Sequence, residues 1–129
     1  MTELLFVYGT LRPGSGHPMS EWLAARSRRL GGAQVRGRLL RVSYYPGLVA
    51  GGDWVKGDVL ELEPLQAETT LAGLDAFEVC RWQDDDEFRR EPGPVELDNG
   101  QLVEAWIYWF RGEGEGLAPV PGGDWLASA

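Results

Sequence analysis

An apolar run near the start of the chain, Leu4 to Tyr8, ends abruptly in a segment rich in glycine and proline. An uninterrupted apolar run bounded by such residues predicts a buried strand followed by a loop. Because Gly9 has no side chain, the backbone N–H groups of Gly9, Thr10 and Leu11 can approach a ligand closely. The stretch is therefore a candidate anion-binding loop, and a hairpin turn that binds no ligand is the alternative.

The size and composition of the chain point to one domain, residues 1–129, with its own hydrophobic core. A hydrophobic fraction of 43% and a mean hydropathy of −0.26 are ordinary for a globular protein of this length. The longest apolar run, residues 105–110, is far too short to cross a membrane, and the N-terminus lacks the basic and apolar regions of a signal peptide. We therefore expect a cytoplasmic protein.

Charge and residue inventory exclude several classes of function. A net charge of −8 repels polyanions, so we expect neither nucleic acid nor an anionic membrane as the main partner. The single cysteine, Cys80, excludes an internal disulfide, and the single histidine, His17, excludes metal sites built from several His or from Cys and His. The chemistry must therefore use carboxylates, hydroxyls and backbone groups, and we expect neither a metal nor a cofactor.

Alternation of apolar and polar residues predicts four further strands. They cover residues 33–43, 54–63, 87–97 and 102–110. A turn over 44–47 joins the first two as an antiparallel pair, and Asn99-Gly100 predicts a hairpin between the last two. Pro92 and Pro94 place the third strand at an edge or a bulge. The fourth is apolar on both faces, which is typical of a strand covered on two sides.

Two helices complete the predicted elements. The shorter covers residues 18–26, with Ser20 as a possible N-cap, and the longer covers 65–78, with Pro64 opening its first turn. The apolar stripe of the longer helix consists of Ala67, Thr70, Leu71, Leu74 and Phe77. Together the elements predict an α+β domain, a small and mostly antiparallel β-barrel with flanking helices.

Glu78 falls on the same stripe as the apolar residues of this helix. A carboxylate among apolar side chains is costly to ionise, so its pKa should rise to a range that suits base chemistry near neutrality. The alternative is that Glu78 lies beyond the last helical turn and only caps the helix or forms a salt bridge. Helical periodicity alone does not choose between the two.

Other segments are interpreted as structural. His17 lies in a loop rich in glycine and proline, next to the candidate site; it is expected to be a solvent-exposed spectator, and contact with the substrate is the alternative. The acidic run Asp84–Glu87 lacks the ligand spacing of a calcium loop, so we expect a solvated loop. No helix follows residues 112–116, so this glycine-rich segment is predicted to be a flexible loop and not a dinucleotide site. Trp125 is expected to dock against the domain.

Several short motifs occur in a fixed order along the chain. They are Val7-Tyr8-Gly9-Thr10-Leu11 with Gly14, Gly37-Arg38-Leu39-Leu40, Tyr45-Pro46-Gly47, Val55-Lys56-Gly57-Asp58-Val59, Leu74-Asp75-Ala76-Phe77-Glu78, Phe88-Arg89-Arg90 and Val120-Pro121-Gly122-Gly123-Asp124-Trp125. This ordered set resembles the gamma-glutamylcyclotransferase-like (AIG2-like) family, particularly its small members related to gamma-glutamylamine cyclotransferase. The resemblance spans nearly the whole chain.

The resemblance implies a small β-barrel flanked by helices and an enzyme that cleaves a gamma-glutamyl amide by cyclisation, releasing 5-oxoproline and an amine or amino acid. It places the catalytic acid/base at Glu78. The backbone of Gly9, Thr10 and Leu11 would then grip the glutamyl carboxylate or the oxyanion of the reaction, with Tyr8 shaping the pocket. Tyr108 would line the pocket, although aromatic core packing is an alternative. Arg90 is expected to pair with carboxylates.

Two positions depart from the family pattern. Val79 stands where a glycine often follows the glutamate, and Phe88 stands where a tyrosine often begins a Tyr-x-Arg element. These departures support a second hypothesis, a binding module without catalysis for gamma-glutamyl or 5-oxoproline-like metabolites. Under both hypotheses the partner is a small gamma-glutamyl molecule, and the protein is expected to be a monomer or a weak homodimer.

Overall fold

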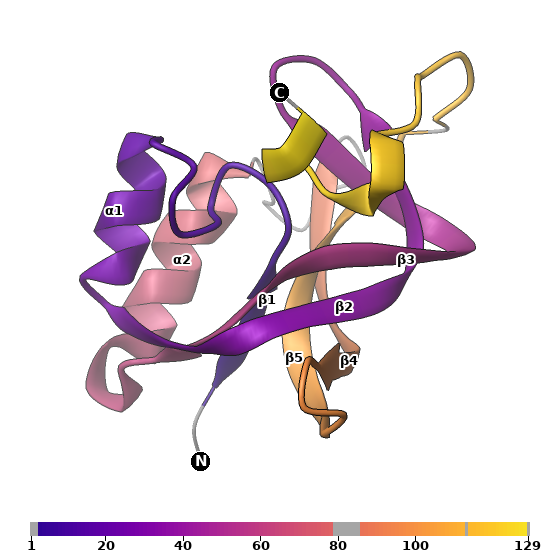
Figure 1. The fold of residues 1–129 in the computed structure, drawn as a ribbon. Helices are drawn as coiled ribbons and strands as arrows, with labels where there is room; N and C mark the ends of the chain where they lie inside the picture. The colour runs from indigo at the N-terminus through magenta and orange to yellow at the C-terminus, as the bar shows by residue number, and fades with distance from the viewer. Residues whose placement is uncertain (1–2, 79–85, 113, 129) are drawn as a thin grey trace.

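The computed structural model describes residues 3–78, 86–112 and 114–128, and its centre is a closed β-barrel (Figure 1). The strands are β1 (Leu4–Val7), β2 (Ser27–Arg41), β3 (Pro46–Leu62), β4 (Phe88–Leu97) and β5 (Leu102–Phe110). The helices are α1 (Pro18–Ala24) and α2 (Ala67–Phe77), and short 3-10 helices cover Pro64–Gln66, Pro121–Gly123 and Leu126–Ser128. The predicted α+β barrel with flanking helices is confirmed.

The strand order around the barrel is β1-β3-β2-β4-β5, and β5 closes onto β1. All neighbouring strands run antiparallel except β1 and β5, which are parallel at Leu5 and Trp106. The sheet is therefore mixed, and the prediction of a mostly antiparallel barrel holds with this one exception. The parallel contact is what places the C-terminal half of the chain beside its first strand.

The β2–β3 hairpin is longer than the sequence pattern predicts. β2 begins at Ser27 instead of residue 33, and β3 begins at Pro46 instead of residue 54. The segment Ser27–Arg29 is polar and shows no alternation, yet it pairs with residues 60–62 at the end of β3. The partner strand, and not the segment's own sequence, thus sets its conformation.

β4 behaves as the edge strand that its prolines predict. It pairs with β5 along its whole length, but with β2 only through Ala33↔Leu97 and Gln34↔Glu96. Because proline has no N–H to donate, Pro92 and Pro94 fit a strand whose second side is mostly unpaired. The predicted Asn99-Gly100 turn is also confirmed, since Gly100 has a φ of +88° and joins β4 to β5.

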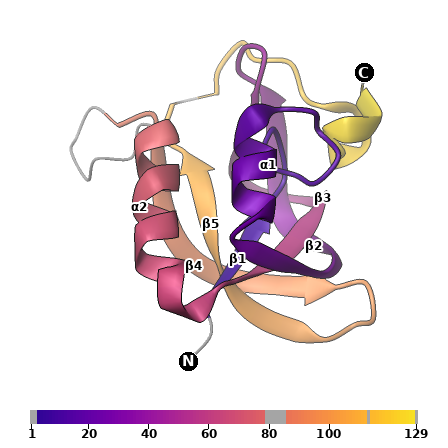
Figure 2. The same cartoon turned by 90° about the vertical axis from the view of Figure 1, so that its left-hand side faces the viewer.

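The two helices lie next to each other on one side of the barrel (Figures 1 and 2). They touch closely, because a Cβ added at Gly73 of α2 would lie 2.7 Å from the ring of Trp22 in α1.

The prediction of Ser20 as N-cap was wrong by one turn. α1 begins at Pro18, and His17 caps it through Nδ1, which accepts from the Met19 N–H at 3.0 Å. No helix in the described part of the chain could span a membrane.

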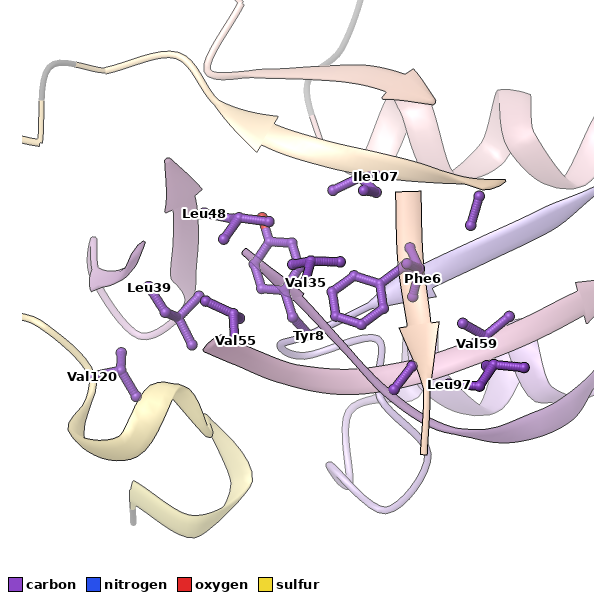
Figure 3. Close-up of a cluster of buried hydrophobic side chains, with 13 residues drawn as sticks. Phe6, Tyr8, Val35, Leu39, Leu48, Val55, Val59, Leu97, Ile107 and Val120 are labelled. Atoms are coloured by element: carbon purple, nitrogen blue, oxygen red, sulfur yellow. The ribbon is translucent and has the colours of Figure 1, made fainter. Parts of the chain in front are cut away.

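The strands of the barrel contribute side chains to two hydrophobic clusters. Alternation along β1 directs Phe6 into the barrel interior, where it meets Val35, Val59 and Ile107 (Figure 3). Leu5 and Val7 face the other way, toward a second cluster. That cluster is formed with Leu23, Leu71 and Leu74 of the helices and with Leu60, Leu62 and Tyr108 of the strands. β1 is apolar throughout because both of its faces are covered.

The C-terminal segment is tied to β2. The Val120 N–H donates to the Leu39 carbonyl at 2.8 Å, and the Arg41 N–H donates to the Ala118 carbonyl at 2.8 Å. Trp125 packs against the barrel core, and the Arg41 guanidinium lies 4.7 Å from the centre of a ring of this tryptophan. The predicted docking of Trp125 is confirmed.

Replacing Gly57 with alanine should destabilise the barrel. A Cβ there would collide with the Val7 carbonyl oxygen and lie 2.7 Å from the Phe6 ring, and the backbone atom cannot move without opening the β1–β3 ladder. We expect the free energy of unfolding to fall by about 1 to 3 kcal/mol. Gly52→Ala is the control because no atom lies within 4 Å of the added Cβ. Urea unfolding of both variants checks this, and equal stabilities would contradict it.

Candidate active site

The loop after β1 is held in place by a buried ion pair. Arg12 donates to Asp58 at 2.9 Å and to Asp124 at 2.9 Å, and Asp58 is 4% exposed. Arg29 donates to the other oxygen of Asp58 at 2.9 Å. Removing a partner from a buried pair leaves an uncompensated charge, so the arrangement fixes the loop against β3 and the C-terminal segment.

Within this loop Gly9 is required by the space available. A Cβ at Gly9 would lie 2.7 Å from Pro46 Cγ, so a larger residue would force the loop away from the start of β3. The Arg12 N–H donates to the Gly9 carbonyl at 3.0 Å, which closes a tight turn. Among the described hydrogen bonds, none uses the N–H of Gly9, Thr10 or Leu11. These donors are available to a ligand.

The Tyr8 hydroxyl is already engaged in the core. It donates to the Tyr108 carbonyl at 2.6 Å and accepts from the Leu48 N–H at 3.3 Å. Burial raises the pKa of this tyrosine well above its ordinary value, and the Glu78 charge adds to the rise. Tyr8 therefore presents its ring to the site, while its hydroxyl joins β5 to β3.

Tyr108 links β5 to the helix that carries Glu78. Its hydroxyl donates to Asp75 Oδ1 at 2.6 Å, and Asp75 also accepts two hydrogen bonds from Arg90, at 2.8 and 3.0 Å. The prediction that Arg90 pairs with a carboxylate is confirmed. Burial, and then the bond to Asp75, raises the pKa of Tyr108 far above its ordinary value, so its phenol is neutral.

The predicted site residues all meet at one cavity of about 200 Å³. It lies between the loop after β1, the end of α2 and the beginning of β4, and its lining includes Tyr8, Gly9, Thr10, Leu11, Glu78 and Tyr108. Residues from both ends of the sequence thus form one wall. A cavity with apolar walls and a few converging polar groups is the usual form of a small-molecule site.

Glu78 lies immediately after α2, as its C-cap, and its N–H donates to the Leu74 carbonyl at 2.9 Å. Both sequence interpretations are therefore partly right: the residue ends the helix and also lines the cavity, with only part of its surface exposed. Burial raises the pKa of the Glu78 carboxyl from 4.5 to about 7, and the charge of Glu87 adds to the rise. At neutral pH the group can both take up and release a proton.

Glu87 is a pocket residue that the sequence interpretation missed. The acidic run was predicted to be solvated, but Asp86 is 5% exposed, and Glu87 lines the cavity and accepts a hydrogen bond from the Tyr45 hydroxyl. That prediction was wrong for these two positions, while Val79 to Asp85 lie outside the described residues. Burial and the Glu87 contact raise the pKa of Tyr45 to about 12, so Tyr45 remains a donor.

His17 is also part of the cavity, contrary to the prediction that it is a solvent-exposed spectator. It is partly buried, caps α1 through Nδ1, and meets the Phe77 ring edge-on with ring centres 5.3 Å apart. The cap fixes the orientation of the imidazole ring, because Nδ1 accepts a hydrogen bond from the Met19 N–H. The ring therefore serves as a wall between α1 and the end of α2.

The described residues include no cluster of three or more His, Cys, Asp or Glu that could hold a metal ion. What the cavity offers is a carboxylate with a raised pKa, backbone N–H groups that donate to no described residue, and aromatic walls. This combination can stabilise an anion at the loop while a proton moves at Glu78.

Residues 5–127 match the family model described as gamma-glutamyl cyclotransferase, AIG2-like. The chain belongs to this family. The Escherichia coli K12 gamma-glutamylcyclotransferase family protein YtfP is 31% identical over 123 residues, which cover 95% of each chain. The family assignment made from the ordered motifs is confirmed.

Several solved structures share the fold of this chain. The solution structure of Escherichia coli YtfP aligns with a TM-score of 0.66 over 95% of this chain and 96% of that one. YkqA from Bacillus subtilis is 27% identical and aligns with a TM-score of 0.72. The alignment covers 98% of this chain and 40% of YkqA. A mouse AIG2-like protein, 22% identical, aligns with a TM-score of 0.70 over 92% of this chain and 85% of that one, which shows the common fold.

Glu78→Gln should stabilise the protein at alkaline pH. The pKa of Glu78 is about 7 in the fold against 4.5 for the free group, so the folded state holds the proton more tightly and stability falls as the pH rises through this interval. Above this pH interval Glu78 is ionised in both the folded and the unfolded state, and the full cost of burying its charge lowers the stability. Glutamine removes that cost, and we expect a gain of about 1 to 3 kcal/mol at pH 8, with a smaller gain at pH 5.

Urea unfolding at the two pH values measures this difference. Glu104→Gln, which removes an exposed carboxylate on β5, is the matched control and should change little at either pH. A Glu78→Gln gain that does not grow with pH would contradict the raised pKa of Glu78.

Proposed function

We propose that this protein is a gamma-glutamyl cyclotransferase that cleaves a gamma-glutamyl amide and releases 5-oxoproline and a free amine or amino acid. The single observation that carries the proposal is Glu78, a carboxyl with a pKa of about 7 that lines the same cavity as the loop after β1. Membership of the gamma-glutamyl cyclotransferase family supports the reaction class.

The reaction suits a site of this kind because the substrate carries its own nucleophile. The α-amine attacks the carbonyl carbon of the glutamyl side chain, a new C–N bond closes the five-membered ring, and the amide C–N bond then breaks. Holding the two reacting groups in contact replaces a bimolecular encounter with an intramolecular one, which lowers the barrier by several kcal/mol, up to about 10. Neither a nucleophilic side chain nor a covalent intermediate with the enzyme is needed.

Glu78 would move the protons. As a carboxylate it accepts a proton from the α-ammonium, and as a carboxylic acid it gives that proton to the nitrogen of the leaving amine. Proton transfer by a positioned side chain typically contributes about 10²- to 10⁴-fold in rate. The pKa of about 7 allows both steps at neutral pH, because neither protonation state is strongly favoured.

The loop after β1 would hold the negative charge. The N–H groups of Gly9, Thr10 and Leu11 donate to none of the residues that the structure describes, so they can bind the glutamyl carboxylate or the oxyanion that forms on the attacked carbonyl. Tyr8 and Tyr108 would shape the walls with their rings, since the protons of both hydroxyls are committed to protein acceptors.

Release of 5-oxoproline from a panel of gamma-glutamyl amines and amino acids tests the proposal. We expect release by the wild type and a loss of at least about 10²-fold in kcat for Glu78→Gln, with the Kd for the substrate nearly unchanged. Glu104→Gln, at an exposed carboxylate, should retain full activity. Binding without release in the wild type would instead indicate a binding module without catalysis.

The pH dependence of kcat/KM gives a second test. Because the base must be ionised, activity should fall on the acid side with an apparent pKa near 7, the value for Glu78. The charge of Glu87 raises this pKa, so Glu87→Gln should move the acid limb to lower pH when a substrate with a neutral leaving group is used. An acid limb that stays at the same pH in Glu87→Gln would contradict the coupling between the two carboxylates.

A further inference from the structure

The loop that joins β1 to α1 holds two consecutive peptide groups by their carbonyls (Figure 1). The Gly9 carbonyl accepts from the Arg12 N–H at 3.0 Å. The Thr10 carbonyl accepts from the Ser15 hydroxyl at 2.6 Å. In a trans peptide the carbonyl and the N–H of the next residue lie in one plane and point in opposite directions. The two bonds therefore also fix the directions of the Thr10 and Leu11 N–H groups.

The Ser15 hydroxyl is itself held in one orientation. Its oxygen accepts from the His17 N–H at 3.2 Å, and it donates its one proton to the Thr10 carbonyl. The Ser15 N–H donates to the Arg12 carbonyl at 3.1 Å, so the backbone of this residue is fixed as well. Since His17 caps α1, Ser15 ties the loop to the start of that helix.

Two glycines make this contact possible. Gly14 and Gly16 flank Ser15 and have φ angles of +90° and +82°, which other residues rarely adopt. No atom lies within 4 Å of a Cβ added at either position, so the backbone angles, and not a lack of space, account for these glycines. They fold the chain back on itself, and the Ser15 side chain reaches a carbonyl five residues earlier.

Ser15 lies behind the wall of the cavity and does not form part of it. Thr10 and Leu11 are lining residues, whereas Arg12 and Ser15 are not among the described residues that line the cavity. The N–H groups of Thr10 and Leu11 donate to none of the described residues. Peptides fixed by their carbonyls from behind, with N–H groups available at the wall, are typical of a prepared anion site.

The two peptides depend on different residues. Without the Ser15 hydroxyl, the Thr10–Leu11 peptide would lose the bond that holds its carbonyl and could turn before a ligand binds. The Gly9–Thr10 peptide would keep its bond to the Arg12 N–H. A ligand would then have to order the Leu11 N–H at a cost in affinity, while the Thr10 N–H would stay in place.

We propose that Ser15 is a positioning residue that directs the Leu11 N–H, so that this group and the Thr10 N–H point at one bound anion. It touches neither the substrate nor the reacting atoms and acts through the Thr10–Leu11 peptide. The inference rests on the proposed cyclotransferase function and adds the side chain that prepares its anion-binding loop.

The probe is 5-oxoproline, which keeps both the carboxylate and the carbonyl that the substrate's amine attacks. Calorimetry measures its Kd, and backbone NMR follows the amide signals of Thr10 and Leu11, in the wild type, Ser15→Ala and Ser15→Thr. Ser27→Ala is the matched control, because the Ser27 hydroxyl also donates to a backbone carbonyl, that of Leu23 at 2.7 Å, and Ser27 does not line the cavity.

We expect the Kd to rise about fivefold or more in Ser15→Ala, and by less than about twofold in Ser15→Thr and Ser27→Ala. In the wild type 5-oxoproline should shift the amide signals of both Thr10 and Leu11. In Ser15→Ala the response of Leu11 should shrink and that of Thr10 should persist, because Arg12 still holds the preceding peptide. A loop that had only loosened as a whole would lose both responses together.

Equal rises in Kd for Ser15→Ala and Ser27→Ala would overturn the inference. So would an equal loss of the Thr10 and Leu11 responses in Ser15→Ala, or a Ser15→Thr variant that behaves like Ser15→Ala.

Release of 5-oxoproline from gamma-glutamyl amides, measured separately on the wild type, distinguishes this inference from the proposed function. Release without an NMR response of either amide would retain the cyclotransferase and remove the role of Ser15. The expected NMR and Kd changes without release would retain the role of Ser15 and remove the enzyme.

Discussion

The position of Glu78 depends on Asp75, one turn earlier in the sequence. Asp75 accepts from the Tyr108 hydroxyl and, through both oxygens, from Arg90, so the last turn of α2 is fastened to β5 and β4 at once. The Tyr108 carbonyl in turn accepts from Tyr8, next to the loop after β1. These bonds join Glu78 and the candidate anion-binding loop through largely buried groups, which keeps their separation fixed.

The same packing that fixes Glu78 makes its charge costly. Burial raises its pKa to about 7, and a raised carboxyl pKa means that ionisation opposes folding. Glu78 itself adds nothing to the stability of the fold above this pH. A residue that is unfavourable for folding but well placed for proton transfer is typical of a functional site, and it relies on the surrounding contacts of Asp75 and Tyr108 to hold the structure.

Sequence patterns predicted the strands, the longer helix and the position of Glu78 on its apolar stripe because each depends on residues close together in the chain, whereas the role of Glu78 came from the family resemblance. The apolar run of β1, the stripe of α2 and the Asn99-Gly100 turn are local signals. Glu87 and Tyr45 were missed because their contact joins positions 42 residues apart, and an acidic run gives no local sign that its last member turns inward. His17 was missed because its cap depends on where α1 begins.

Two carboxylates, Glu78 and Glu87, line the same cavity, and the charge of Glu87 affects the protonation of Glu78. Burial raises the pKa of Glu78, and the negative charge of Glu87 adds to the rise. Removing the charge of Glu87 would remove this repulsion and lower the pKa of Glu78, so Glu78 would ionise at lower pH. Glu87 thus acts on the protonation of Glu78 through charge alone and without movement of the fold.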